Sequence, residues 1–213
     1  MDKAYRTVRA SVQHEIVIQK SRFIGRCFPL KQEKDALEQL AAIRKAHWDA
    51  SHHCYAYVIG RQGLTARYSD DGEPGGTAGL PMMEVLKAKQ LTDVLVVVTR
   101  YFGGTLLGAG GLVRAYSRAT TEVLNEAGTV DMLPSDSFWL RMDYSLWSRL
   151  QAPLQKAGYL LEEPEYGQEV RVLLWVQQTK RDTMQKNVIQ WSEGRVTPQF
   201  FSTEYMAWNS SEL

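Results

Sequence analysis

A glycine-rich stretch, residues 103–111, is the most informative candidate for chemistry in this sequence of 213 residues. It holds five glycines, namely Gly103, Gly104, Gly108, Gly110 and Gly111. Glycine tolerates positive φ and close backbone approach, and free amides at the start of a helix bind anions with help from the helix dipole. Because the stretch lies between an expected strand and an expected helix, it predicts a site for a phosphate group or a nucleic-acid backbone. The alternative is a tight turn packed against another element.

Four arginines are candidates to complete this anion site. Arg100 precedes the glycine-rich stretch, and Arg114 and Arg118 lie one turn apart in the helix expected after it. Arg22 stands beside Phe23, an arrangement in which the arginine holds a phosphate while the ring stacks on a base. On a regular strand the ring faces away from the arginine, so the alternative places Phe23 in the core. The stretch matches neither the P-loop nor the dinucleotide fingerprint, and no cofactor is predicted.

An acidic loop over residues 70–79 offers a second kind of chemistry. Asp70, Asp71 and Glu73 are of the type that binds Mg²⁺ or performs acid–base catalysis, with His53 as a further catalytic candidate. The spacing is not that of an EF-hand. The alternative is a loop whose aspartates accept hydrogen bonds from turn amides. We list these four residues as catalytic candidates and predict no metal site.

A histidine pair starts the strand expected over residues 53–59. Side chains alternate along a strand, so His52 and Cys54 share one side and His53 takes the other. Residues two apart on a strand are separated by about 7 Å, which is loose for a direct Cys–His dyad. The chain contains two cysteines, Cys27 and Cys54, which cannot supply a disulfide framework. Reduced thiols in a cytoplasmic protein are therefore expected.

The hydrophobic periodicity predicts an α+β fold in two domains, residues 1–133 and 134–208. In the first, strands are expected over residues 11–18, 22–28, 53–59, 64–69 and 94–100, and helices over 32–47, 80–89 and 112–127. The second follows the order β-α-β-β-α-β of a ferredoxin-like domain. Its first helix is expected to be capped by Ser145 and kinked or shortened by Pro153. Trp208 is expected to begin a loose tail available to a partner.

The overall charge excludes a strongly basic chain that binds polyanions over its whole surface. Lys and Arg number 25 against 24 Asp and Glu, a net charge of +1. Residues 1–133 hold 17 basic and 14 acidic residues, whereas residues 134–213 hold 8 and 10. Contact with a polyanion is therefore expected on the first domain. The strongest apolar run, residues 94–98, is too short to span a bilayer, so no membrane association is expected.

Several motifs together resemble the IMPACT family, in its bacterial YigZ-like branch. They are Lys20-Ser-Arg-Phe-Ile, His52-His-Cys-Tyr-Ala-Tyr, Tyr68-Ser-Asp-Asp-Gly-Glu-Pro-Gly-Gly-Thr-Ala-Gly and Thr99-Arg-Tyr-Phe-Gly-Gly-Thr-Leu-Leu-Gly-Ala-Gly-Gly-Leu-Val-Arg-Ala-Tyr. The resemblance implies a first domain with the βα-sandwich fold of the second domain of ribosomal protein S-five. It also implies that the two domains are similar to the fourth and fifth domains of elongation factor G. Eukaryotic members regulate translation with the help of an additional N-terminal domain.

These observations favour a factor that binds nucleic acid or the ribosome and takes part in translation regulation. RNA or the ribosome is the expected partner, and a protein partner is a further expectation. The alternative is a small-molecule or phosphate-handling enzyme, a hydrolase or a transferase, that uses the acidic and glycine-rich loops. A protein-interaction module is a third reading, and whether the chain is an enzyme stays open.

Overall fold

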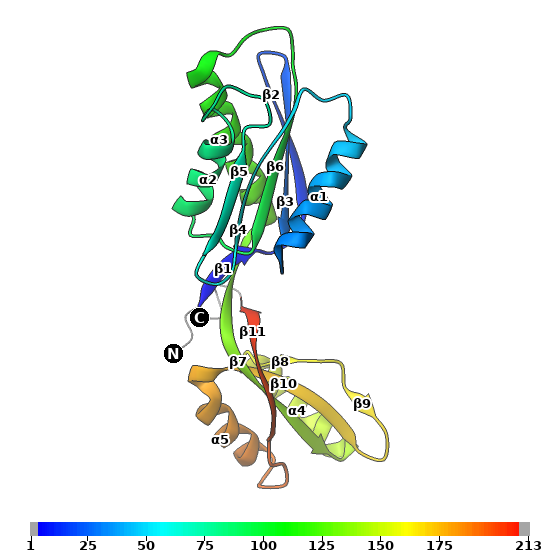
Figure 1. The fold of residues 1–213 in the computed structure, drawn as a ribbon. Helices are drawn as coiled ribbons and strands as arrows, with labels where there is room; N and C mark the ends of the chain where they lie inside the picture. Colours follow the sequence, from blue (N-terminus) through cyan, green and yellow to red (C-terminus); the bar gives the residue numbers. More distant parts are fainter. Residues whose placement is uncertain (1–3, 209–213) are drawn as a thin grey trace. The chain divides into compact units, whose positions relative to one another are not determined.

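The computed structural model describes residues 4–208. The chain is α+β and divides between Asp131 and Met132 into two compact units (Figure 1). Each unit has a hydrophobic core of its own. Within residues 4–208, no helix is long and apolar enough to cross a membrane.

The first unit is built on a five-stranded antiparallel sheet. In spatial order the strands are β2 (Val12–Ile18), β3 (Ser21–Pro29), β6 (Val94–Tyr101), β4 (His52–Ile59) and β5 (Thr65–Ser69). The central strand is β6, which is buried on both faces and therefore reads in the sequence as a continuous apolar run. The expected positions of all five strands are confirmed to within a few residues.

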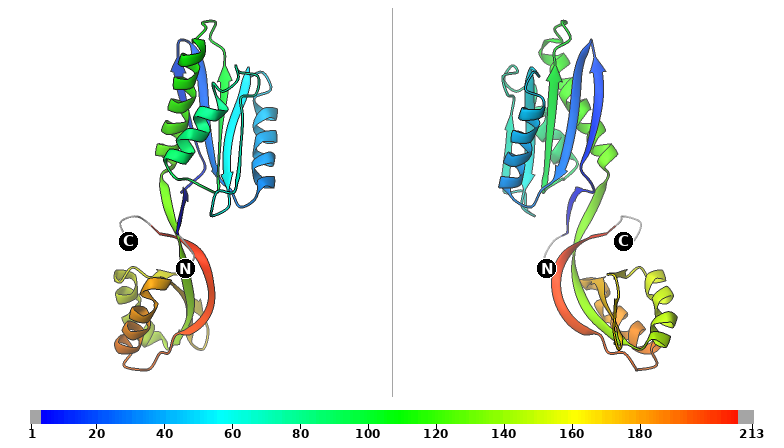
Figure 2. Two further views of the ribbon diagram at one scale, coloured as in Figure 1. Left: turned by 60° about the vertical axis from the view of Figure 1, so that its left-hand side comes forward. Right: turned by 90° about the vertical axis from the view of Figure 1, so that its right-hand side faces the viewer.

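Helices cover both faces of this sheet, as the views in Figure 2 show. On one face lie α2 (Gly79–Ala88) and α3 (Gly108–Ala127), and on the other lies α1 (Glu33–Ala46). The alternation of side chains along β6 explains the two layers. Val96 and Val98 point into the core beneath α2 and α3, whereas Leu95 and Val97 join the smaller core beneath α1.

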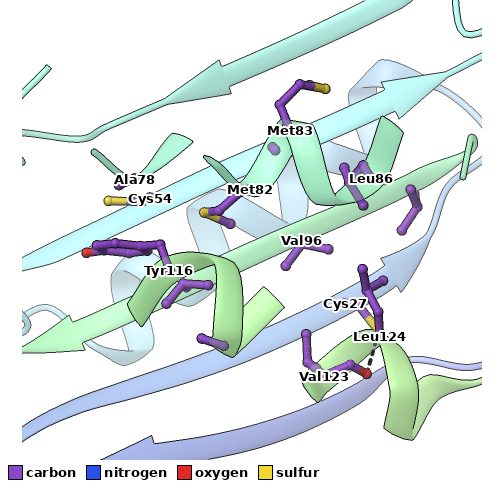
Figure 3. Close-up of a cluster of buried hydrophobic side chains, with 14 of the residues drawn as sticks. Cys27, Cys54, Ala78, Met82, Met83, Leu86, Val96, Tyr116, Val123 and Leu124 are labelled. Carbon is purple, nitrogen blue, oxygen red and sulfur yellow. Dashed lines mark hydrogen bonds between the residues drawn. The ribbon is translucent and has the colours of Figure 1, made fainter. Parts of the chain in front are cut away.

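The larger core lies between the sheet and the helices α2 and α3 (Figure 3). Tyr116 from α3 and Met82 from α2 meet β4 and β6 there, and both side chains are fully buried. Burial raises the pKa of the Cys27 thiol to about 11 and that of Cys54 to about 12. Both cysteines are free and neutral at physiological pH, so neither is an activated nucleophile.

The second unit confirms the ferredoxin-like expectation. Its elements are β7 (Thr129–Met142), α4 (Tyr144–Lys156), β8 (Leu160–Leu161), β9 (Glu165–Tyr166), β10 (Val170–Gln177), the 3₁₀ turn Gln178–Lys180, α5 (Arg181–Trp191) and β11 (Gln199–Trp208). The spatial order β11-β7-β10-β8 is that of a ferredoxin-like sheet. The short strand β9 extends it by pairing with β10. The short strand β1 (Tyr5–Val8) belongs to the first unit and pairs with β7.

Three details of the second unit correct the sequence interpretation. The cap of α4 is Asp143, whose carboxylate accepts the Leu146 amide at 2.8 Å, whereas Ser145 only donates to that carboxylate. Pro153 does not shorten α4, which continues past it to Lys156. Trp208 is buried in β11, so it is not an exposed contact for a partner. Residues 209–213 of the expected tail lie outside the described residues.

Candidate functional site

A buried ion pair lies at the end of β6. Arg100 Nη1 donates to Glu73 Oε1 at 2.7 Å, and the Tyr116 hydroxyl donates to the same oxygen at 2.7 Å. The side chains of Glu73 and Arg100 are 3% and 6% exposed. A charge buried to this extent is tolerated when it is paired and hydrogen-bonded, as both are here. The pair brings a charged residue of the acidic loop against a charged residue beside the glycine-rich stretch.

The guanidinium of Arg100 is held on several sides. The rings of Phe23 and Phe102 lie 5.3 and 5.5 Å from it. Ser21 Oγ lies 3.4 Å from Nη2 and also accepts the Gly103 amide at 3.1 Å. Arg100 Nε is buried and has no hydrogen-bond acceptor among residues 4–208. One donor of a buried cation is therefore unused by the surrounding protein, which is unusual in a folded interior.

His52 stands beside this pair because β4 places it opposite Arg100 of β6. Its Nδ1 lies 2.8 Å from the carbonyl oxygen of Asp71, and a carbonyl only accepts, so Nδ1 carries a proton. Nε2 is then directed toward Glu73 Oε2, at 3.9 Å. This separation is too long for a direct hydrogen bond.

A pocket of about 490 Å³ opens over these groups. It is lined by Ser51, His52, Gly72, Glu73, Pro74, Arg100, Phe102, Leu106, Leu107, Gly108, Ala109 and Leu112. One wall is the start of α3, whose N-cap residue is Leu107 and whose first turn has neither a side-chain cap nor an acidic residue. The first amides of a helix have no partner within the helix, so this wall presents free donors and a positive dipole end.

Two of the three carboxylates in the acidic loop accept hydrogen bonds from within the first unit. Asp70 accepts the backbone amides of Gly76, Ala78 and Gly79 at 2.8–3.0 Å and so fixes the start of α2. Asp71 accepts from Arg44 at 2.9 Å and from the backbone amide of His53 at 2.7 Å. Of the three loop carboxylates, Glu73 lines the pocket. Among the described residues, no group of three or more metal-binding side chains is arranged to hold an ion.

The structure does not bring the side chain of His53 to Glu73. His53 points to the α1 face, where its Nδ1 lies 3.2 Å from Thr99 Oγ1, and burial lowers its pKa. The histidine at the pocket is its neighbour His52, which lies on the shared side that the strand alternation predicts for His52 and Cys54. The second residue that the sequence reasoning missed is Tyr116, which carries no signal because it falls within the apolar stripe of α3.

The four candidate arginines do not form one cluster. Arg100 is buried in the ion pair with Glu73. Arg22 pairs with Glu15 at 2.9 Å and lies over the ring of Tyr101, which belongs to the α1 face. On the outer surface of α3, Arg118 pairs with Glu122 at 2.6 Å. Arg114, one turn earlier, is exposed.

The candidate glycines divide between a loop and a helix. Gly103 packs so closely that a Cβ there would lie 2.1 Å from the backbone of Lys20. Gly104 and Gly108 adopt φ of +81° and +69° in open space. Gly110 and Gly111 belong to the first turn of α3, which begins four residues before the expected start at residue 112. The loop is therefore shorter than expected. Glycine loses more conformational entropy than other residues when it becomes helical, but this cost does not prevent the first helical turn from forming.

Comparison with known proteins follows the same two-part division. A model of the Impact N-terminal domain matches residues 19–124, and a model of a domain of unknown function (DUF1949) matches residues 140–195. The Bacillus subtilis protein named IMPACT family member YvyE is 40% identical over 90% of this chain and 88% of its own length. The Escherichia coli protein named IMPACT family member YigZ is 35% identical over 70% of this chain and 74% of its own.

A solved structure extends the similarity to the fold. A crystal structure titled as that of a hypothetical protein aligns with a TM-score of 0.59 and 28% identity. The alignment covers 95% of this chain and 99% of the other. The similarity therefore includes both units.

Proposed function

The chain belongs to the IMPACT family, and from that premise we propose that it binds RNA on the ribosome and takes part in the regulation of translation. The observation that carries the proposal is the exposed, uncapped start of α3, where Gly108, Ala109 and Gly110 form the first turn. The translation-linked role is what the family resemblance implies.

The surroundings of this helix start support contact with a phosphate backbone. Lys20 lies in the turn between β2 and β3, and its backbone packs against Gly103 of the glycine-rich loop. Arg114 follows on α3, and both side chains belong to exposed residues. Exposed cations beside free helix amides match the spaced negative charges of a nucleic-acid strand. Arg118 contributes less to this surface because Glu122 neutralises it.

The acidic loop takes no part in the proposed RNA contact. Asp70 and Asp71 are engaged by backbone amides and Arg44, and Glu73 is paired with Arg100. Free carboxylates would repel a phosphate backbone. Because the carboxylates of the acidic loop are paired within the unit, they favour phosphate binding at the neighbouring helix start.

The test is fluorescence polarisation of a labelled single-stranded RNA at several salt concentrations. Lys20→Ala/Arg114→Ala should weaken binding and reduce the slope of log K against log salt by about 1.4, at about 0.7 for each lost phosphate contact. The matched control is Lys156→Ala/Lys186→Ala, which removes the same charge from exposed positions of the second unit. Equal binding by the two double variants would refute the proposed surface.

A further inference from the structure

We propose that the second unit holds single-stranded RNA on the face of its sheet that its helices leave uncovered. Bases stack there on the rings of Phe201 and Trp139, and a phosphate group lies at Arg141. Such a surface deepens the RNA binding proposed above, on which it depends, by a second place and a second kind of contact. At the start of α3 the contact is with phosphate groups, whereas on this sheet it is mainly with the bases.

The two helices of the second unit lie on the same side of its sheet (Figure 2). Phe138 and Leu140 of β7 point to that side, where they pack in the core with residues of α4 and α5. Side chains alternate along a strand, so Trp139 and Arg141 point to the opposite side. The pairing of β7 with β10 places Arg171 on that side as well, directly opposite Arg141. We call this side the open face of the sheet.

Two aromatic rings are accessible on the open face. Phe201 of β11 is 58% exposed, and the half-buried ring of Trp139 lies beside it, with the ring centroids 6.0 Å apart. A base of any type stacks on an accessible ring, and open four-stranded sheets with aromatic side chains bind single-stranded RNA in this way. Trp175 of β10 is not available to a base, because it is buried and its indole donates to Glu162 at 2.7 Å.

The charges of the open face favour an anionic ligand beside the rings. Arg141 and Arg171 lie opposite each other, so neither supplies the counter-charge of the other. Arg171 pairs with Glu169 at 3.1 Å, and Glu165 lies opposite it on β9. Arg141 is exposed and has no acidic partner among residues 4–208. A strand of RNA brings a phosphate for this cation together with bases for the rings, which an apolar protein surface does not.

Phe200 provides a matched control in the same strand. It is 54% exposed, and its ring centroid lies 5.8 Å from that of Phe138, which points to the helix side of the sheet. Phe200→Leu and Phe201→Leu therefore remove similarly exposed rings from opposite sides of β11. A general effect of the substitution on the strand appears in both variants, whereas loss of a stacked base appears in Phe201→Leu alone.

The experiment is fluorescence polarisation of labelled oligouridine with the full chain at several salt concentrations. Phe201→Leu should weaken binding at least about fivefold, the loss expected from one stacked base, and Phe200→Leu should bind as the wild type does. The slope of log K against log salt should be the same in both variants, because neither removes a charge. Trp139→Leu should weaken binding, and Trp139→Phe should retain most of it, since a ring remains.

The cation and the bases are tested separately. Arg141→Gln should weaken binding and reduce the salt slope by about 0.7, the value for one lost phosphate contact. The unfolding free energy should not fall in this variant, because the change removes one of two like charges that face each other. A labelled RNA duplex should bind the wild type and Phe201→Leu equally, since its bases are stacked within the duplex.

Equal binding of oligouridine by Phe201→Leu and Phe200→Leu would overturn the proposal, and the exposed rings would then favour a protein partner. This outcome is distinct from failure of the α3 surface. Lys20→Ala/Arg114→Ala lowers the salt slope and leaves the rings in place, whereas Phe201→Leu removes a ring and leaves the slope unchanged. Absence of RNA binding by the wild type at every salt concentration would overturn both proposals.

Discussion

At the scale of single residues, the site depends on a carboxylate and a guanidinium paired inside the protein. Glu73 and Arg100 are tolerated there because each is the hydrogen-bond partner of the other, and Tyr116 adds a third partner. Removing one member of such a pair leaves an uncompensated buried charge, whose cost is several times that of an exposed pair. The charged groups of the pocket are for this reason also structural groups.

Two histidines of the first unit should give its stability opposite pH dependences. Burial lowers the pKa of His53 from 6.5, so the unfolded chain binds more protons just below pH 6.5. Stability from this group is therefore lost as pH falls through 6.5. Hydrogen bonding to Glu126 raises the pKa of His14, so its contribution is present below pH 6.5 and is lost as pH rises above it.

Urea unfolding between pH 5 and 8 measures this difference. His53→Gln should flatten the fall of the unfolding free energy below pH 6.5, and His14→Gln should flatten its fall above pH 6.5. Identical pH profiles for the wild type and His53→Gln would contradict the inference.

At the scale of elements, the glycine-rich stretch combines a close contact with a flexible helix start. Gly103→Ala should destabilise the first unit by about 2–4 kcal/mol, because its Cβ would collide with the backbone of Lys20. Gly110→Ala should stabilise it by about 0.5–1 kcal/mol, since that position is helical and open. Urea unfolding of the two variants checks both signs. Equal effects would mean that residues 103–111 act as one uniform loop.

The sequence alone predicts the long elements of both units and the short strand β8, and it misses the strands β1 and β9. The strand over 94–98 and the helix α3 are predicted from the spacing of apolar residues along the chain, which the sequence shows directly. The strands β1 and β9 contain four and two residues and exist because a longer strand lies beside them. Their positions are set by pairing between distant segments, which no local period reveals.

The sequence predicts which loops form the candidate site, but it does not predict which side chains pair with one another there. The acidic loop and the glycine-rich stretch are visible as compositions, and the structure places both at the pocket through Glu73 and Gly108. The choice between His52 and His53 depends on which face of the sheet carries α3. The pairing of Arg118 with Glu122, and of Arg22 with Glu15, likewise follows from rotamers and register.

At the scale of the whole molecule, the two units have separate cores. Phe138, Leu140 and Leu174 pack with residues of the second unit, and Tyr116 packs with residues of the first. A mutation in one core should therefore lower the stability of that unit and leave the other unchanged.

Hydrogen exchange during urea unfolding tests this independence. Tyr116→Phe removes a buried hydrogen bond to a charged acceptor and should cost about 1.5–3 kcal/mol in the first unit alone. Tyr68→Phe, at an exposed ring of the same unit, is the matched control. Equal loss of protection in both units would show that the molecule unfolds as a single cooperative body.

The pairing of β4 with β6 has a consequence for how the site can change over evolution. His52 lies opposite Arg100 and His53 opposite Thr99, so a slip of one residue would exchange the two histidines between the faces of the sheet. The same slip would turn Cys54, Ala56 and Val58 out of the larger core. An insertion or deletion in β4 would thus be eliminated by misfolding before it could alter the chemistry of the pocket, which ties the identity of the pocket histidine to the apolar residues that follow it.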